Sequence, residues 1–470
     1  MLFRVLTCLL MASLMGEALK AERPSRRTTQ PNFILIVADQ LGVDEWGKQV
    51  QPPVATPNLD QLSSEGLTFT AAYAGSPAGA AARGSLMTGQ MAGHGRIRSE
   101  IQEPLLDEDI TLAESLRSVG YRSGLIGLWG LGWEGTSGTP MKQGFQEFLG
   151  TLDLVHGANF KTPFLWRNEL AFTMNPFPGA RQSDLMLHWM LRGATNFIRM
   201  NEDESMLLCF TPPLPGKDST HGVQTSEWME ARKERIQQLD SQVGALLAQL
   251  KRRQLDTETL VVLTSVPTYG ASLKPTSGFL QGTTPLRTGN SGLYEGNLRV
   301  PLVARWIGHL RAGTTNLPVA ACDILPTLAQ LAGAPSPKGI DGRSLAPLLQ
   351  GKPLTNSRPA LYWESHGATP AQAGRIGEWK AIQTGSTWEL YHLTQDPRET
   401  TNLAEKNPEA LKPFAELFRE QSRPWKKPAD LAARAIGRSG MTAPTNTFRS
   451  PMRTNFVPVG PRSDLLEGNK

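Results

Sequence analysis

The sequence predicts an α/β fold: a doubly wound, mostly parallel sheet, with a small C-terminal antiparallel sheet plus a helix. The first observation is residues 31–38, PNFILIVA, an apolar run bounded by a proline and by Asp39. Such a run is typical of a strand buried on both faces of a parallel sheet. The second is that apolar runs at residues 123–126, 206–210 and 259–264 alternate with helical patterns. This alternation is typical of doubly wound sheets.

The helices are predicted by their start signals and their periodicity. Thr56 is expected to be an N-cap, with Pro57 at the first helical position. Thr111 and Glu114 form a capping box that begins a helix ending near Gly120. Further helices are expected at residues 183–200, 225–253 and 324–332, and a further strand at 299–306. Beyond residue 350 the pattern predicts short strands at 360–363, 373–382 and 387–392, then a helix at 407–421.

Composition places the 470-residue chain among globular proteins. Apolar residues make up 39% and charged residues 19%, and the formal net charge is +5. This charge is small and no block of five or more Lys or Arg occurs, so the sequence does not indicate nucleic acid as a partner. We expect an α/β domain at residues 31–350, a small α+β subdomain at 351–421 and a disordered, Pro/Arg-rich tail at 422–470.

The first 21 residues have the pattern of a secretory signal peptide. Arg4 precedes an apolar run at residues 5–15, and Ala18 and Ala21 are candidate cleavage positions. The run is too short to span a bilayer, so no transmembrane segment is expected in the mature chain. Export would place the protein in the periplasm or outside the cell. Cys209 and Cys322 would then remain, either as two buried thiols or as a disulfide.

Residues 76–89, SPAGAAARGSLMTG, form the central motif of the sequence. They follow a β-rich segment and have the composition of a turn that opens a helix of very small residues. Small side chains allow close backbone approach. A helix N-terminus near an arginine, here Arg83, is also a general anion site.

Together with other motifs, this stretch resembles the sulfatase family. That family has Cys (or Ser)-x-Pro-Ser/Ala-Arg followed by Leu-x-Thr-Gly; here the frame has Gly79-Ala80-Ala81-Ala82-Arg83 and then LMTG at 86–89. The further matches are TPNLD at 56–60, GHGRIR at 93–98, GLWGLG at 127–132, YEGNLRVP at 294–301, DILPT at 323–327, DGRSL at 341–345, ELY at 389–391 and DPRET at 396–400. Their order and spacing extend the resemblance over residues 31–420 and are most similar to the arylsulfatase-A-like bacterial branch. The resemblance implies an alkaline-phosphatase-like fold.

The resemblance also implies which catalytic groups should be present, and the nucleophile is not. Sulfatases oxidise the Cys or Ser at Cβ to formylglycine, whose hydrated aldehyde attacks sulfur. Gly79 has no Cβ, so no formylglycine can form there. The family calcium ion requires six to eight oxygen ligands. Its first aspartate pair appears as Asp39-Gln40, and its second pair falls at Val266-Pro267, which offer no side-chain oxygen. We therefore expect no metal and no cofactor.

The charge-stabilising groups of the family are replaced as well. Leu128 and Asn290 stand where the family has lysines, and Pro213 stands where it has a histidine. His156 is the one histidine kept from the family's His-Ala-His-Asn pattern. Each lost donor typically costs 10² to 10³ in rate. The losses affect one catalytic unit and cannot be compensated singly.

The sequence leaves several roles open. Arg83 could hold an anion or pair with Asp39, and His156 could be a ligand or a hydrogen-bonded structural residue. His94, Arg96 and Arg98 could face the mouth of a pocket or lie on a solvated loop. Arg375, Trp379 and Lys380 resemble a segment bordering the family's substrate cleft, but could equally pack across strands. Ser76 and Ser85 are the candidates for a replacement nucleophile.

Three functional hypotheses follow. The first is an exported protein that has lost sulfate-ester hydrolysis and binds a sulfated carbohydrate, another anionic ligand or a partner protein. The second is an active sulfate or phosphate ester hydrolase with a rebuilt nucleophile and metal site, which predicts a bound divalent ion. The third is a surface interaction module that works through the basic tail after Ser422.

Overall fold

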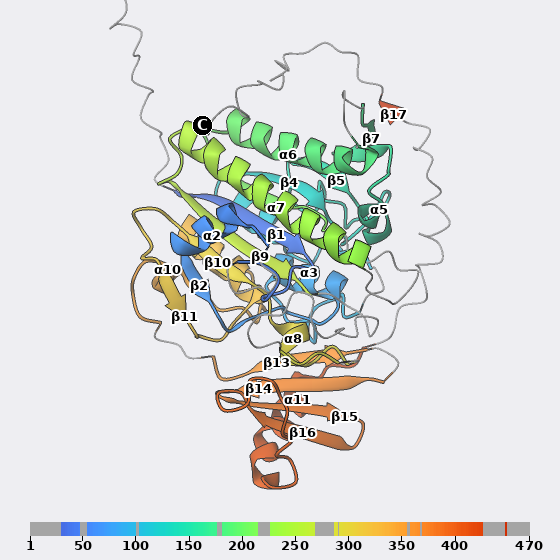
Figure 1. The fold of residues 1–470 in the computed structure, drawn as a ribbon, viewed down its shortest axis with the longest axis vertical. Coiled ribbons are helices and arrows are strands. Elements are labelled where there is room, and N and C mark those ends of the chain that lie inside the picture. The colour runs from blue at the N-terminus through green and yellow to red at the C-terminus, as the bar shows by residue number, and fades with distance from the viewer. Residues whose placement is uncertain are drawn as a thin grey trace, which may run out of the picture.

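A computed structural model describes residues 30–47, 54–99, 103–175, 181–214, 226–267, 286–289, 291–354, 358–366, 369–425 and 447–448. Within these residues, eleven strands form one large sheet (Figure 1). In spatial order they are β11 (Gly313–Thr315), β2 (Leu67–Phe69), β10 (Leu302–Arg305), β9 (Thr259–Val266), β1 (Asn32–Asp39), β8 (Met206–Thr211), β4 (Arg122–Leu128), β5 (Glu147–Thr151), β6 (Phe164–Arg167), β7 (Leu170–Thr173) and β17 (Thr447–Phe448).

The apolar run at residues 31–38 forms β1 in the middle of this sheet, as predicted. It pairs in parallel with β8 on one side and with β9 on the other. Alternate side chains enter two separate cores: Phe33 and Leu35 belong to one cluster, Ile34 and Ile36 to the other. This two-sided burial explains why residues 33–38 are all apolar. The sheet is mixed rather than wholly parallel, since β10 pairs with β9 antiparallel.

Helices cover both faces of the large sheet. The face that receives Ile34 and Ile36 is covered by α2 (Pro57–Ser64), α6 (Gln182–Met200) and α7 (Ser226–Arg252). In Figure 1, α6 and α7 lie side by side across it. The opposite face is covered by α3 (Gly79–Thr88), α4 (Leu112–Arg117) and α9 (Ile324–Ala332). The doubly wound α/β fold predicted from the sequence is therefore confirmed.

A second, four-stranded antiparallel sheet lies at one end of the molecule (Figure 1). Its strands are β13 (Leu361–Ser365), β14 (Ala371–Ile376), β15 (Trp379–Thr384) and β16 (Thr387–His392), and α11 (Lys412–Gln421) packs on it. The smaller elements are β3 (Ala72–Tyr73) paired with β12 (Val319–Ala320), α5 (Leu154–Ala158), α8 (Glu295–Leu298), α10 (Ala346–Leu349) and 3₁₀ turns at Ala321–Asp323 and Pro408–Leu411.

Three local predictions need correction. The single strand expected at residues 373–382 is a hairpin, because Gly377 adopts φ +59 and turns β14 back into β15. Thr56 is the N-cap residue of α2 and Pro57 its first residue, as predicted, but the Thr56 side chain makes no capping bond; its hydroxyl instead accepts a hydrogen bond from the Gly47 amide at 3.0 Å. The helix expected at 407–421 begins as the 3₁₀ turn, and α11 starts only at Lys412.

Other local predictions are confirmed. Thr111 and Glu114 form the capping box of α4. Cys209 and Cys322 are both buried free thiols. Within the described part of the chain, no helix combines the length and apolarity needed to cross a bilayer. The predicted signal peptide and most of the predicted tail lie outside the described residues.

Candidate functional site

The carboxyl edge of the large sheet brings five of the predicted site residues together. β1 ends at Asp39, which lies in register with Val266 of β9. α3 begins at Gly79 and places Arg83 one turn later. The Arg83 guanidinium donates hydrogen bonds to the Asp39 carboxylate and, at 3.4 Å, to the carbonyl of Leu128 at the end of β4. Arg83 thus joins β1, α3 and β4.

The small residues of the central motif allow α3 to pack tightly at this edge. Ala78 precedes the helix in an extended conformation, and its amide donates to the Ser76 hydroxyl at 3.1 Å. A Cβ on Gly75 would lie 1.8 Å from Ser85 Oγ, so Ser85 occupies the space that a side chain there would need. Both serines therefore have local structural roles, and neither contacts a histidine in any hydrogen bond described for it.

Arg83 is held in a buried position. Its side chain is 4% exposed, against 15% for the paired Asp39. The aliphatic part passes close to Gly130, where a Cβ would lie 3.3 Å from Arg83 Cδ. Among the described residues, none accepts a hydrogen bond from the buried Arg83 Nε. Pairing with Asp39 is thus present in the structure, and one donor of the guanidinium is left over.

The backbone turn after β1 is fixed by hydrogen bonds to groups on β9 and α7. Gln40 has φ +65, and its amide donates to the Val266 carbonyl at 3.1 Å. Its carbonyl accepts from Nη2 of Arg232, a buried residue of α7 that also pairs with Glu45. Ser265 Oγ accepts from the Leu41 amide at 2.9 Å. The polar groups here are used to hold the turn.

The oxygen donors at this edge do not fit a calcium ion. Asp39 supplies the one carboxylate of the candidate set, and it is paired with Arg83. Val266 and Pro267 are buried and apolar, and Ser265 Oγ is hydrogen-bonded to the protein backbone. Calcium requires six to eight oxygens. Nowhere in the described ranges do three or more His, Cys, Asp or Glu side chains form a group that could hold a metal.

The side chain of Leu128 acts as packing, and the remaining predicted site residues are buried elsewhere or lie outside the described residues. Leu128 is buried against Gly157, where a Cβ would lie 2.7 Å from Leu128 Cδ1. Pro213 is buried just beyond the end of β8. Asn290 lies outside the described residues.

His156, in α5, has a structural environment. Its Nε2 lies 2.8 Å from Thr162 Oγ1 and 3.1 Å from the Phe164 carbonyl, and its ring centroid lies 4.5 Å from that of Phe164. Burial lowers the pKa of His156, against a smaller opposing effect of Asp153. A neutral, hydrogen-bonded imidazole accounts for these contacts.

The basic residues after α3 connect loops and do not line an open site. His94 Nδ1 lies 2.7 Å from Asp341 Oδ1, and its Nε2 lies 3.1 Å from the Gln421 carbonyl at the end of α11. Arg96 pairs with Glu108 and Asp109. Arg98 is buried and donates to the Arg423 carbonyl at 3.0 Å. Neither alternative considered for these residues, a pocket mouth or a solvated loop, describes His94 and Arg98.

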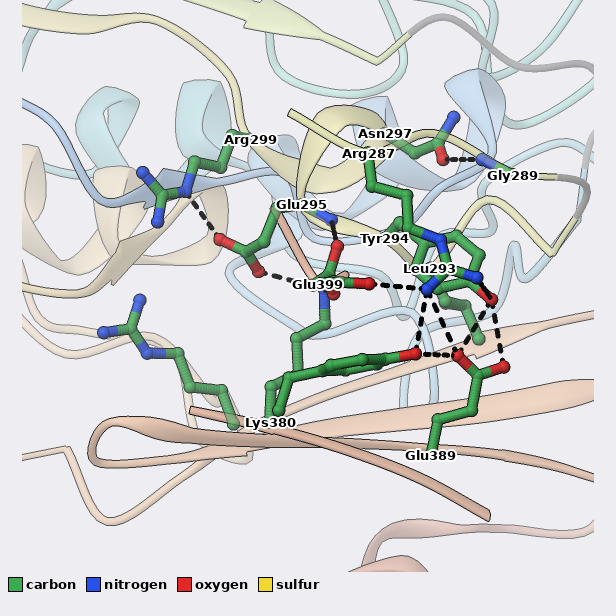
Figure 2. Close-up of polar contacts among 12 residues, drawn as sticks. Arg287, Gly289, Leu293, Tyr294, Glu295, Asn297, Arg299, Lys380, Glu389 and Glu399 are labelled. Carbon is green, nitrogen blue, oxygen red and sulfur yellow. Dashed lines mark hydrogen bonds and ion pairs between the residues drawn. The ribbon is translucent and has the colours of Figure 1, made fainter. Parts of the chain in front are cut away.

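A buried ionic cluster joins α8 to the small sheet (Figure 2). Glu295 Oε1 accepts from Lys380 Nζ at 2.9 Å, and Oε2 accepts from Arg299 at 2.6 Å and from the Tyr73 hydroxyl at 2.8 Å. Glu399 Oε1 also lies 2.8 Å from Lys380 Nζ. Burial by itself raises the pKa of Glu295, but the charges of Lys380 and Arg299 and the hydrogen bonds outweigh it and lower the pKa to about 2.

A second cluster continues this junction towards solvent (Figure 2). The Arg287 guanidinium donates to the hydroxyls of Tyr294 at 2.9 Å and Tyr391 at 2.8 Å. Both hydroxyls in turn donate to the Glu389 carboxylate. Burial raises the pKa of Tyr294 to about 12, so this phenol remains protonated as a donor at neutral pH.

Some of these residues belong to motifs that are visible in the sequence, but their connections are visible only in the structure. Lys380 and Arg375 are direct cross-strand neighbours, and Arg375 donates to the Tyr73 hydroxyl. Trp379 packs its ring edge-on against His392, its partner on β16. The segment thus packs across strands, and Lys380 also anchors the small sheet to α8.

Comparisons with known proteins give the family. The family model described as Sulfatase matches residues 31–334, and the one described as N-sulphoglucosamine sulphohydrolase, C-terminal, matches residues 290–421. Arylsulfatase A from Bos taurus is 30% identical, covering 82% of this chain and 87% of that protein. Arylsulfatase A from Homo sapiens is 29% identical over the same shares.

Solved structures show the same fold. The crystal structure of Ps i-CgsB has a TM-score of 0.69 at 23% identity and covers 89% of this chain and 100% of its own. A structure described in complex with its substrate D-glucosamine-2-N,6-O-disulfate has a TM-score of 0.65 at 17% identity, covering 84% of this chain and 98% of its own. The match of the sulfatase model over most of the large sheet and its helices leads to one conclusion: this chain belongs to the sulfatase family.

Proposed function

We propose that this sulfatase-family protein is exported, has lost sulfate-ester hydrolysis, and acts by binding a sulfated carbohydrate. The observation that carries the proposal is Gly79. It occupies the frame position of the family nucleophile, at the first residue of α3, and has no Cβ from which an aldehyde could be made. Catalysis by the family route therefore has no starting group.

The surroundings of Gly79 support the same proposal. The one carboxylate of the candidate calcium set pairs with Arg83, and the lysine position before the central tryptophan is the buried Leu128. A nucleophile restored alone would meet neither a metal nor that cationic donor. Because catalytic groups of one unit act together, the loss of several is not repaired by any single one.

The ligand class is supported by chemistry and by similar proteins. The N-terminus of α3 lies close to Arg83 in the sequence, and helix N-termini and arginines bind anions in many proteins. One similar structure contains a sulfated glucosamine, and two similar enzymes are named arylsulfatase A. A sulfated sugar fits both observations without requiring turnover.

The test measures turnover and binding on the same purified, exported protein. We expect no sulfate release from 4-methylumbelliferyl sulfate or from sulfated oligosaccharides above the buffer rate, with an active arylsulfatase as positive control. We expect calorimetric binding of sulfated oligosaccharides that is lost on desulfation. Turnover that disappears in Arg83→Ala, together with a stoichiometric divalent metal, would instead establish the hydrolase with a rebuilt site.

A further inference from the structure

A pocket of about 320 Å³ lies at the end of the small sheet, near the point where β13 gives way to β14. We call it the sheet-end pocket and define it by His366, Gln372, Gln383, Ser422, Arg423 and Trp425. None of these residues belongs to the carboxyl edge of the large sheet that carries Asp39 and Arg83. Its size is at the lower end of the range for small-ligand sites.

Strand register places the polar side chains of the pocket side by side. Glu364 of β13 lies opposite Gln372 of β14, which lies opposite Gln383 of β15. Directly opposed residues of an antiparallel sheet share a face and lie close enough to act together. The pocket therefore has two neighbouring carboxamides on one surface.

The other wall is a short extended segment after α11, residues 422–425, which is tied to the protein on both sides. Arg98 donates to the Arg423 carbonyl at 3.0 Å, and Gln372 lies 3.5 Å from Ser422 Oγ. The Trp425 indole lies against the His366 ring, with centroids 4.1 Å apart and planes inclined by 33°.

His366 is itself oriented by a buried carboxylate. Its Nε2 lies 2.7 Å from Glu364 Oε1, and Glu364 is 4% exposed. Glu364 also accepts from the Tyr362 hydroxyl at 3.2 Å. These contacts hold His366, and with it the indole of Trp425, in a defined position. Such pre-organisation reduces the entropy lost on binding.

Two polar side chains of the pocket, those of Gln383 and Arg423, make no hydrogen bond or ion pair within the described part of the chain. Arg423 is exposed and Trp425 is partly exposed. An indole offers an apolar face with a polar N–H, carboxamides bind hydroxyl groups in both directions, and a guanidinium binds an anionic oxygen in a forked geometry.

We propose that the sheet-end pocket binds a sugar ring that carries a sulfate or carboxylate group. Trp425 packs against the apolar C–H face of the ring, Gln372 and Gln383 bind its hydroxyls, and Arg423 binds its anionic group. The inference shares only its ligand class with the proposed function, because it uses residues away from Gly79 and Arg83. The protein would then hold a glycan through its small domain.

The experiment is isothermal titration calorimetry on the full chain with carrageenan-derived and heparin-derived hexasaccharides and their desulfated counterparts. We expect Trp425→Ala to weaken binding of the sulfated probes at least tenfold. Arg423→Gln should weaken them about three- to tenfold and remove the preference over desulfated probes. The Arg423 contribution should also decrease as salt concentration rises, because an exposed charge pair is screened.

Matched variants test whether these effects are local. Arg419→Gln removes the same charge from an exposed arginine on α11, and Trp379→Phe alters a tryptophan on the same sheet that packs on His392. Both should leave affinity unchanged, and all four variants should keep the wild-type melting temperature within about 2 °C. Wild-type affinity in both Trp425→Ala and Arg423→Gln would overturn the sheet-end pocket. It would leave the proposed loss of hydrolysis intact, since that is decided by turnover.

Discussion

The ammonium of Lys380 lies 2.9 Å from the carboxylate of Glu295, and neither side chain has any exposure to solvent. Lys380 belongs to β15 of the small sheet, and Glu295 begins α8 beside the large one. With Glu399 and Arg299 the cluster contains two positive and two negative charges. Lys380 and Glu399 come from the small domain, Glu295 and Arg299 from the main domain, and the Lys380–Glu295 contact joins these two pairs across the junction.

Replacing Lys380 by methionine should be strongly destabilising. The substitution keeps the approximate length of the side chain but leaves Glu295 and Glu399 buried without their shared cation. Removing one partner of a buried ion pair typically costs about 3–5 kcal/mol. Guanidinium denaturation should show a loss of unfolding free energy in this range, with the small domain unfolding first.

Two further variants separate charge from shape in this prediction. Glu399→Gln, added to Lys380→Met, should recover at least a third of the loss, because it removes the carboxylate left without a cation and keeps Glu295 paired with Arg299. Lys412→Met changes an exposed lysine that is 73% accessible and should alter stability by less than about 0.5 kcal/mol. No recovery in the double variant would show that packing, and not charge, explains the effect of Lys380.

Asp44→Asn should stabilise the protein in a pH-dependent way. Burial, reinforced by the charge of Glu45, raises the pKa of Asp44 to about 6 from an ordinary value of 3.8. The folded state thus binds this proton more tightly than the unfolded state, so the carboxylate destabilises the fold above about pH 6, and the penalty disappears as pH falls towards 4. We expect a gain of about 1–3 kcal/mol at pH 8 and none at pH 4.

The measurement for Asp44 is thermal unfolding across this pH range. Asp107→Asn is the matched control, because it removes the same charge from an exposed position. An equal gain from both variants would assign the effect to net charge. A gain from Asp44→Asn that persists at pH 4 would contradict the explanation by a partly buried carboxylate.

Local signals made the fold predictable, whereas long-range pairings were not predictable. The run that became β1 could be recognised because a strand buried on both faces has a continuous apolar stretch, here residues 33–38. The hairpin around Gly377 was missed because two short strands joined by a two-residue turn resemble one longer strand. Ser265 was not singled out by the sequence, although its hydroxyl holds the turn after β1.

The candidate site shows the same division. The sequence identified Gly79 and Arg83 through a local frame and offered Asp39 as a partner, which the structure places against Arg83. Glu295 and Lys380 are 85 residues apart, and no pattern in one chain links two charges over that separation. The available signal was the position of Lys380 inside a predicted strand. A lysine that becomes fully buried is expected to have a charged partner, since lysine is rarely fully buried unless it is paired.

Restoring the missing side chain should not restore catalysis. In Gly79→Cys, co-expressed with a formylglycine-forming enzyme, mass spectrometry would report whether the cysteine is converted, and sulfate release would report turnover. We expect no turnover above that of Gly79→Ala, because Leu128 and Val266 still supply neither donor nor ligand. Turnover rising at least a hundredfold over the alanine control would show that the nucleophile was the one missing part.

Calcium should not stabilise the protein. A ligand that binds only the folded state raises unfolding free energy by RT ln(1 + [L]/Kd), about 2.7 kcal/mol at a hundredfold excess over Kd. Since the Asp39 carboxylate pairs with Arg83 and Val266 offers no side-chain oxygen, we expect 10 mM calcium chloride to change the melting temperature no more than sodium chloride of equal ionic strength. Elemental analysis after chelator-free purification should find less than about 0.1 divalent ion per chain. A saturable rise of several degrees specific to calcium, abolished by Asp39→Asn, would mean that Arg83 yields its partner to the metal and that the site retains a ligand set of its own.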